Sequence, residues 1–213
     1  MLYNKSYLEV PMPPKQRISK ETILETAFTL LRREGEAAIN ARSIARAAGC
    51  STQPIFSAYS SMDELREALC RKALAVYNQY MERGLQNGPA FKGAGAAYIA
   101  FAREEPVLFR LLYMTPLRGM NSVTGRMDEN WARILQVVQE ATGLSKPLAE
   151  RLYLDCWIFV HGIAVMEATG TMHFTEEQIS TMLSDQFLGI CGRLHQQAAL
   201  KEKGAADYAD PEC

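Results

Sequence analysis

The chain has 213 residues, of which 48% are hydrophobic, and its 23 Lys and Arg nearly balance its 24 Asp and Glu. This composition is typical of a water-soluble globular protein with one domain, or with a small domain attached to a larger one. The five cysteines are scattered without a CxxC pair, and no apolar run approaches the roughly 20 residues of a membrane span. The sequence therefore argues against a disulfide framework and predicts a soluble protein of the reducing cytoplasm without a membrane partner.

The charge is unevenly distributed along the chain. Residues 1–61 hold eight basic and five acidic side chains, a net charge of +3, which leaves 15 basic and 19 acidic side chains, a net charge of −4, in the remainder. A basic N-terminal part is consistent with a nucleic-acid partner, although a solvated helix face gives the same count.

Helical periodicity begins near Ser19, which is placed to cap a first helix that ends at Gly35. Its apolar face comprises Ile23, Leu24, Ala27, Phe28, Leu30 and Leu31, and Ile18 is placed to form a hydrophobic staple with Ile23. A short second helix is expected over Ala41–Ala48, with Asn40 as its cap and Gly49 as its end.

Ser51 is expected to open the third helix, where Pro54 falls within the first turn. Proline is tolerated there because the first N–H groups of a helix have no intrahelical partner. Ser61 and Glu64 form a capping box for a fourth helix that runs to about Leu85.

Further helices are expected near residues 91–104, 106–114, 122–142, 146–169 and 175–197, the last opened by a Thr175–Gln178 capping box. The predicted fold is all-α with about nine helices. The predicted division is an N-terminal tail and helix-turn-helix domain over residues 1–61, a larger helical domain over 62–202 and a mobile tail over 203–213.

The spacing of Ala45, Gly49 and Ile55 matches a helix-turn-helix, which needs a small residue at the crossing, a glycine turn and an aliphatic anchor. The surrounding segment ARSIARAAGCSTQPIFSAYSSMDEL resembles the DNA-binding head of TetR/AcrR-type transcriptional repressors over roughly residues 18–70. YIAFAREEPVLFRLLYM (98–114) and CWIFVHGIAVM (156–166) are similar to a C-terminal domain found in that family.

The resemblance implies a three-helix head, a linking fourth helix, and a helical body that binds ligand and dimerises. It implies a cytoplasmic homodimeric repressor that leaves double-stranded operator DNA when a small apolar or drug-like effector binds, without a cofactor or catalytic activity. The sequence departs from common family residues at positions that often contact phosphate, namely Thr52, Gln53, Phe56, Ala58 and Met62. Weak or salt-insensitive operator binding is therefore expected.

Candidate DNA contacts lie around the third helix, where Gln53 is suited to pair with adenine and Pro54 to pack on a thymine methyl. Phe56 and Ile55 are expected in the core, and Tyr59 either packs there or contacts DNA. The other candidates are Thr52, Ser57, Asn40, Arg42, Lys15, Arg17 and Lys20. Capping by Asn40, and simple solvation of the three basic residues before the first helix, are the alternatives.

Candidate ligand contacts are aromatic, thioether and imidazole side chains at helical spacing in the larger domain, most of which must also serve as core. They are Tyr77, Tyr80, Met81, Tyr98, Phe101, Phe109, Tyr113, Trp131, Trp157 and His161. His161 is equally compatible with a hydrogen-bonded core position. Tyr80 is expected to carry the ligand signal through the fourth helix.

The last two helices are expected to form the dimer interface, because each has an apolar stripe. The stripes comprise Tyr153, Trp157 and Val160 on one helix and Ile179, Met182, Leu183, Phe187, Ile190 and Leu194 on the other.

Two other functions have weaker support in the sequence. Asp155, Cys156 and His161 are close in sequence, but residues five apart on a helix point to different faces, so they form no catalytic pair. A metal-responsive DNA-binding regulator is the alternative, with Cys191 and His195 one helical turn apart and His173 as a further ligand.

Overall fold

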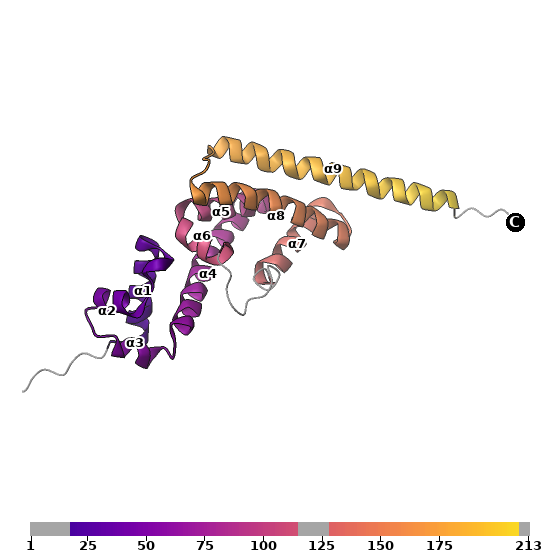
Figure 1. The fold of residues 1–213 in the computed structure, drawn as a ribbon. Coiled ribbons are helices and arrows are strands. Elements are labelled where there is room, and N and C mark those ends of the chain that lie inside the picture. Colours follow the sequence, from indigo (N-terminus) through magenta and orange to yellow (C-terminus); the bar gives the residue numbers. More distant parts are fainter. Residues whose placement is uncertain (1–17, 115–127, 209–213) are drawn as a thin grey trace, which may run out of the picture. The chain divides into compact units, whose positions relative to one another are not determined.

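The computed structural model describes residues 18–114 and 128–208, and all regular structure in these ranges is helical (Figure 1). The prediction of an all-α fold is confirmed: nine α-helices and one short 3-10 helix occur in the described ranges. The chain divides into two compact units, Met1–Glu67 and Ala68–Cys213. Lys15 and Arg17 lie outside the described residues.

The first unit contains α1 (Lys20–Glu34), η1 (Glu36–Ala38), α2 (Ala41–Ala47), α3 (Gln53–Ala58) and the start of α4 (Met62–Gln86). Ser19 caps α1 as predicted, because its Oγ accepts a hydrogen bond from the Thr22 amide at 3.0 Å. Gly35 ends the helix, but with φ 81° and ψ 179° instead of the expected left-handed helical conformation. That backbone region is essentially restricted to glycine.

The corner between α2 and α3 has the predicted helix-turn-helix features. Ala45 and Ile55 are buried, and Gly49 between them adopts a positive φ of 66°. The third helix is capped at Thr52, one residue later than expected, and Pro54 lies in its first turn. The proline therefore marks a helix start, as its sequence position indicated.

Glu64 fixes the start of α4 to α1. The Glu64 amide donates to Ser61 Oγ at 3.1 Å, while the Glu64 carboxylate accepts from the Ser60 amide at 2.7 Å and from Lys20 Nζ at 2.9 Å. The hydrogen bonds from Lys20 and then Ser60 lower the pKa of Glu64 to about 2. The capping box thus forms, with Ser60 in place of Ser61 as the amide donor.

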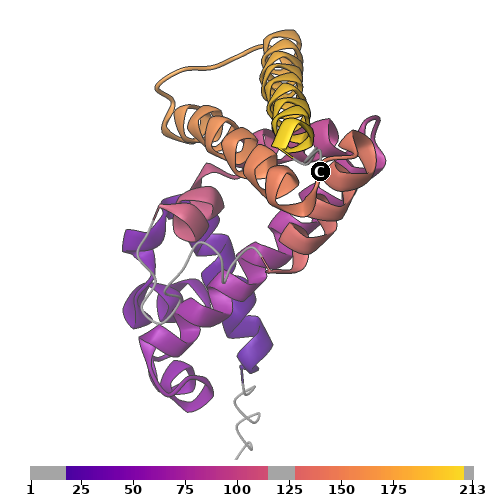
Figure 2. The ribbon, with the colours of Figure 1, turned by 90° about the vertical axis from the view of Figure 1, so that its right-hand side faces the viewer.

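The second unit comprises the remainder of α4 with α5 (Ala90–Glu104), α6 (Pro106–Tyr113), α7 (Asp128–Thr142), α8 (Lys146–Thr169) and α9 (Glu176–Tyr208). The central helix α8 packs against α5, α6, α7 and α9, and Figures 1 and 2 show α8 and α9 side by side. The last helix continues to Tyr208, beyond its expected end at residue 197.

The helices α4 and α5 cross in backbone contact at Gly84 and Gly93. A Cβ built on Gly93 would lie 2.0 Å from the Gly84 carbonyl oxygen, and a Cβ on Gly84 would lie 2.5 Å from the Gly93 carbonyl oxygen. Real atoms do not approach so closely, so both positions require glycine. This crossing sets the spacing of two helices that both contribute to the wall of the cavity described below.

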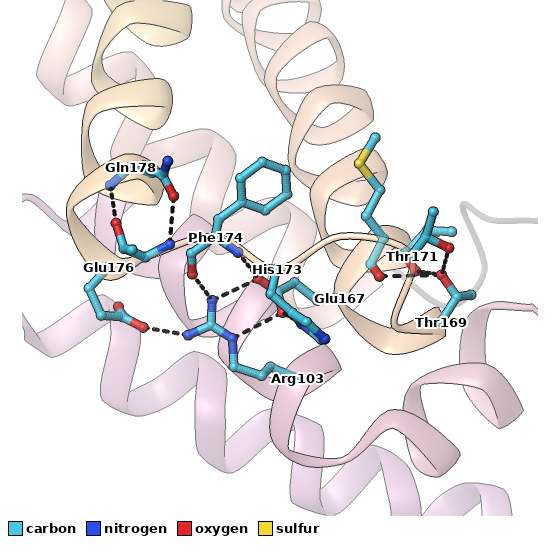
Figure 3. A network of polar contacts seen from close by, with 11 residues as sticks. Arg103, Glu167, Thr169, Thr171, His173, Phe174, Glu176 and Gln178 are labelled. Atoms are coloured by element: carbon cyan, nitrogen blue, oxygen red, sulfur yellow. Dashed lines mark hydrogen bonds and ion pairs between the residues drawn. The ribbon is translucent and has the colours of Figure 1, made fainter.

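A polar cluster joins α5 to the connection between α8 and α9 (Figure 3). The Glu167 carboxylate is inaccessible to solvent and accepts from Arg103 Nη2 at 2.8 Å, His173 Nδ1 at 2.9 Å and the Phe174 amide at 2.9 Å. Burial alone would raise the pKa of Glu167, but these hydrogen bonds outweigh it and lower the pKa to about 2. The predicted capping box follows at once, with Thr175 and Gln178 exchanging hydrogen bonds of 2.8 and 3.2 Å.

By length and composition alone, α8 is apolar enough to cross a membrane, contrary to the expectation from the sequence. Between Asp155 and Glu167 it has no charged residue, which leaves an apolar stretch over residues 156–166. A core helix of a soluble protein passes the same test, and α8 is the helix against which four others pack.

Candidate DNA-binding surface and ligand cavity

The third helix presents polar side chains to solvent. Gln53 and Ser57 are exposed, Thr52 and Pro54 are half-buried, and Ile55 beneath them is 1% exposed. Ser57 Oγ donates to the Gln53 carbonyl oxygen at 3.0 Å, which leaves its oxygen lone pairs facing outward as acceptors. The amide of Gln53 has no comparable internal partner in the described residues and is free to reach a base edge.

Two aromatic residues of this region differ in burial from each other, and only one lies in the core. Phe56 is 54% exposed, so its predicted core position is wrong; a helix of six residues buries one narrow stripe, which Ile55 occupies. Tyr59 is 2% exposed, its ring lies 4.4 Å from Lys20 Nζ, and its hydroxyl donates to the Lys20 carbonyl oxygen at 3.5 Å. Tyr59 therefore packs in the core, and its assignment as a DNA contact is wrong.

At the N-terminus of α2, Asn40 acts as the helix cap. Asn40 Oδ1 accepts from the Ser43 amide at 3.0 Å, so the side chain is a helix cap, and it remains exposed. Arg42 next to it is exposed. Lys20 pairs with Glu64 and lies over Tyr59, which gives it a structural role in the first unit.

The second unit contains a partly open cavity of about 350 Å³ among α4, α5, α7, α8 and α9. Four of the predicted ligand residues line it, namely Tyr77, Met81, Tyr98 and Trp157. This volume is at the lower end of the range for small-molecule sites, and the wall is mainly apolar, as such sites usually are.

Comparison with known proteins finds similarity to transcriptional regulators. Residues 91–186 match the tetracyclin repressor-like C-terminal domain. An HTH-type transcriptional regulator of Mycobacterium tuberculosis strain H37Rv, Rv0681, is 25% identical over 171 residues, which cover 79% of this chain and 78% of that protein. These matches support the assignment of the chain as a TetR-type transcriptional regulator.

Solved structures share the TetR fold at low sequence identity. The regulatory protein SCO4313 superposes with a TM-score of 0.61 at 19% identity, covering 81% of this chain and 95% of that one. A TetR-like transcriptional regulator from Rhodococcus sp. RHA1 gives a TM-score of 0.57 at 17% identity, covering 83% and 96%. TetR-family regulators are soluble proteins that bind operator DNA and dimerise, and they are typically not enzymes.

Six of the predicted ligand residues do not line the cavity, because their side chains pack against other residues instead. Phe101 and Phe109 are fully buried in the aromatic cluster beside it. Tyr80 instead packs on Phe101 and donates to Glu104 Oε2 at 2.7 Å. The others are Tyr113, in the same cluster, Trp131, whose ring contacts Tyr153, and His161.

His161 supports the wall of the cavity from behind. Its ring stacks on Trp157 with centroids 5.0 Å apart, and its Nδ1 lies 2.9 Å from the Tyr98 hydroxyl. Burial lowers the pKa of His161 and raises the pKa of Tyr98. Both rings are therefore neutral near pH 7, and His161 contacts both of the wall residues Tyr98 and Trp157.

Several wall residues belong to the apolar stripes of α8 and α9, for which the sequence predicts a dimer interface. Tyr153, Val160, Leu183 and Phe187 line the cavity. The interface interpretation is wrong for the stripe residues that are buried within one chain, which are Tyr153, Val160, Ile179, Leu183 and Leu194. An apolar stripe at helical spacing looks the same in sequence whether it faces its own chain or a partner.

Neither catalysis nor metal binding finds support in the site geometry. Burial raises the pKa of Cys156 to about 12, which keeps this cavity-wall thiol protonated and unreactive at neutral pH. In the described residues no three side chains of the metal-binding types gather. His173 bonds to Glu167 before α9 begins, whereas Cys191 lies about 22 Å along that helix at 1.5 Å per residue.

Proposed function

We propose that this regulator is a homodimeric repressor that leaves its operator when a small, largely apolar molecule occupies the cavity. The cavity itself is the observation that carries the proposal, because a volume of about 350 Å³ lined by aromatic and aliphatic side chains is suited to a small organic ligand. A ligand can act on DNA binding only by favouring one conformation of the body over another.

The fourth helix provides the covalent path for such a signal. Leu65, near its start, is fully buried in the first unit, while Tyr77 and Met81 further along the same helix line the cavity in the second. A ligand that displaces Tyr77 or Met81 therefore acts on an element shared with the DNA-binding unit. The typical coupling between two such sites corresponds to a 5- to 150-fold change in affinity.

The outward faces of α8 and α9 are proposed as the dimer interface. Leu154 and Ile158 lie one turn apart on α8 and are 45% and 57% exposed, and Leu188 on α9, which also lines the cavity, is 65% exposed. Gly162, one further turn along α8, leaves open space at its Cβ position. Exposed apolar side chains beside a glycine permit close packing of helices from a second copy.

The test begins with selection of bound sequences from random duplex DNA by the purified protein. We expect enrichment of a two-part site with half-sites about 34–36 Å apart or a multiple of this, as two reading helices require. Apolar compounds found to bind the protein are then added to the complex with the enriched site, and release is measured. Absence of enrichment at low salt, or cavity binding without any change in operator affinity, would contradict the proposal.

A further inference from the structure

One part of the cavity wall is polar, and it lies between α5 and α9. Lys92 Nζ donates to Ser184 Oγ at 2.8 Å, and the Ser184 hydroxyl donates in turn to the Ser180 carbonyl oxygen at 3.0 Å. Because the single hydroxyl proton is used by that carbonyl, the oxygen faces Lys92 as an acceptor. The two helices therefore hold the ammonium group in a defined position at the cavity.

Lys92 is also the only cavity-lining side chain in the described residues that carries a formal charge at neutral pH. An ammonium group has three N–H donors, and Ser184 accepts one of them. In the described part of the chain Lys92 makes no ion pair, and no carboxylate lines the cavity. Lys92 is half-buried, so water at the cavity is left to satisfy the other donors.

A ligand that fills the cavity displaces this water, and its charge determines which interactions Lys92 then makes. A neutral apolar molecule covering Lys92 would remove water from a charged group and return no hydrogen bond, which is unfavourable. A cationic molecule would add repulsion, with no acidic side chain among the described wall residues to offset it. An anionic group would instead accept charge-assisted hydrogen bonds, which are shorter and stronger than those between neutral groups.

We propose that Lys92 and Ser184 form an anion subsite, and that the ligand is an amphiphilic organic anion. Its apolar body would lie among Tyr77, Phe91 and Trp157, and its single carboxylate or sulfonate would lie at Lys92. The identification of this ligand as the effector rests on the function proposed above.

The experiment compares two fluorescent probes that differ by one sulfonate group, 8-anilinonaphthalene-1-sulfonate and the neutral N-phenyl-1-naphthylamine. Titrations use the full-length protein and its Lys92→Met variant, which keeps the apolar stem and removes the charge. We expect the variant to bind the anionic probe at least about tenfold more weakly, as the loss of a hydrogen bond to a charged group requires. Affinity for the neutral probe should not fall, and it should rise where that probe covers Lys92, because the variant removes the cost of taking water from the charged group.

Two control variants define the origin of the effect. Lys146→Met removes the same charge from an exposed position outside the cavity and should leave both affinities unchanged. Ala94 is a buried wall residue, and Ala94→Phe places a ring in the cavity, so both probes should bind more weakly. Circular dichroism and the melting temperature confirm that each variant is folded, and Lys92→Gln replaces Lys92→Met if the latter is not.

Equal loss of both probes in Lys92→Met, or an unchanged affinity for the anionic probe, would overturn the anion subsite. Retention of both probes by folded Ala94→Phe would overturn it as well, since they would then bind elsewhere. A different result contradicts the proposed function. If probe discrimination is observed but no cavity ligand alters operator affinity, the subsite stands and the regulatory proposal falls; the reverse result leaves regulation standing without the anion preference.

Discussion

At the scale of single residues, Gln53 and Arg42 are expected to play different parts in DNA recognition. Both are exposed, but Gln53 begins the third helix and Arg42 lies in the first turn of the second. An amide that pairs with adenine reads sequence, whereas a guanidinium near a helix N-terminus contacts phosphate.

We predict that Gln53→Ala relaxes the preference at one base position of each half-site and costs about 1–3 kcal/mol on the best operator. Arg42→Ala, as the comparison, should weaken binding to all sequences and reduce the slope of log K against log salt by about 0.9 for each phosphate that the protein no longer neutralises. Fluorescence anisotropy on the selected operator and its single-base variants measures both. Uniform weakening by Gln53→Ala would assign that residue to the backbone instead.

Glu167 makes stability depend on pH in a defined direction. Its pKa falls from the usual 4.5 to about 2 in the folded protein, so its stabilising contribution is complete above about pH 4.5 and is lost as the pH falls towards 2. Glu167→Gln should lower the free energy of unfolding by about 2–4 kcal/mol at pH 7, because it leaves Arg103 without its buried partner.

The measurement is urea unfolding of both proteins at pH 7 and pH 3, where the difference should shrink by more than half. Glu176 is the matched control, since it also pairs with Arg103 at 2.6 Å but its side chain is 83% exposed. Glu176→Gln should cost less than about 1 kcal/mol at either pH. A difference between Glu167→Gln and the natural protein that does not change with pH would contradict the assigned pKa.

At the scale of helices, the crossing of α4 and α5 is the contact least able to accept change. A Cβ at Gly93 meets a backbone carbonyl at 2.0 Å, and backbone cannot move aside as a side chain can. We predict that Gly93→Ala destabilises the protein by about 2 kcal/mol or more, as overpacking usually does. Gly189→Ala, at a helical position with open space, should instead stabilise it by up to about 1 kcal/mol. Thermal unfolding of both variants tests the pair.

The helices themselves were largely predictable from the sequence, because caps and breaks are local signals. Ser19, Asn40, the Thr175–Gln178 box and Pro54 all act within one helical turn of their own position, and each has its predicted local role. The side-chain environments were less predictable. Periodicity shows that Tyr80 and Tyr77 are apolar-facing, but it does not show that Tyr77 reaches a cavity while Tyr80 bonds to Glu104.

The cavity could not be located from the sequence for a further reason. Its wall is assembled from five helices, so residues such as Phe91, Ile134 and Phe187 become neighbours only after those helices pack. A stripe such as that of Leu183 and Phe187 satisfies equally well a core, a ligand wall or a partner surface. The role of the stripe depends on how the neighbouring helices pack against it. The periodicity within one segment carries no information about that packing.

At the scale of the whole molecule, we predict that Ile158→Glu converts the dimer to monomers that lose specific operator binding. Ile158 is 57% exposed within one chain, so a charge there leaves the monomer fold intact but is strongly unfavourable in an apolar interface. Light scattering after gel filtration gives the mass. Met172→Glu is the control, because Met172 is 51% exposed but lies in the connection between α8 and α9. A stable Ile158→Glu dimer would place the interface elsewhere.

The cluster around Arg103 has a consequence for the divergence of this chain from its relatives. Arg103 donates from Nε and Nη2 to Glu167, from Nη2 to the Phe174 carbonyl oxygen and from Nη1 to Glu176, so four of its hydrogen bonds depend on one planar fork. Lysine offers one nitrogen and cannot reproduce them. Substitutions at positions 103 and 167 are therefore expected to be inherited together, so that an alignment of close homologues shows either the arginine–glutamate pair or two uncharged residues, and rarely a mixture.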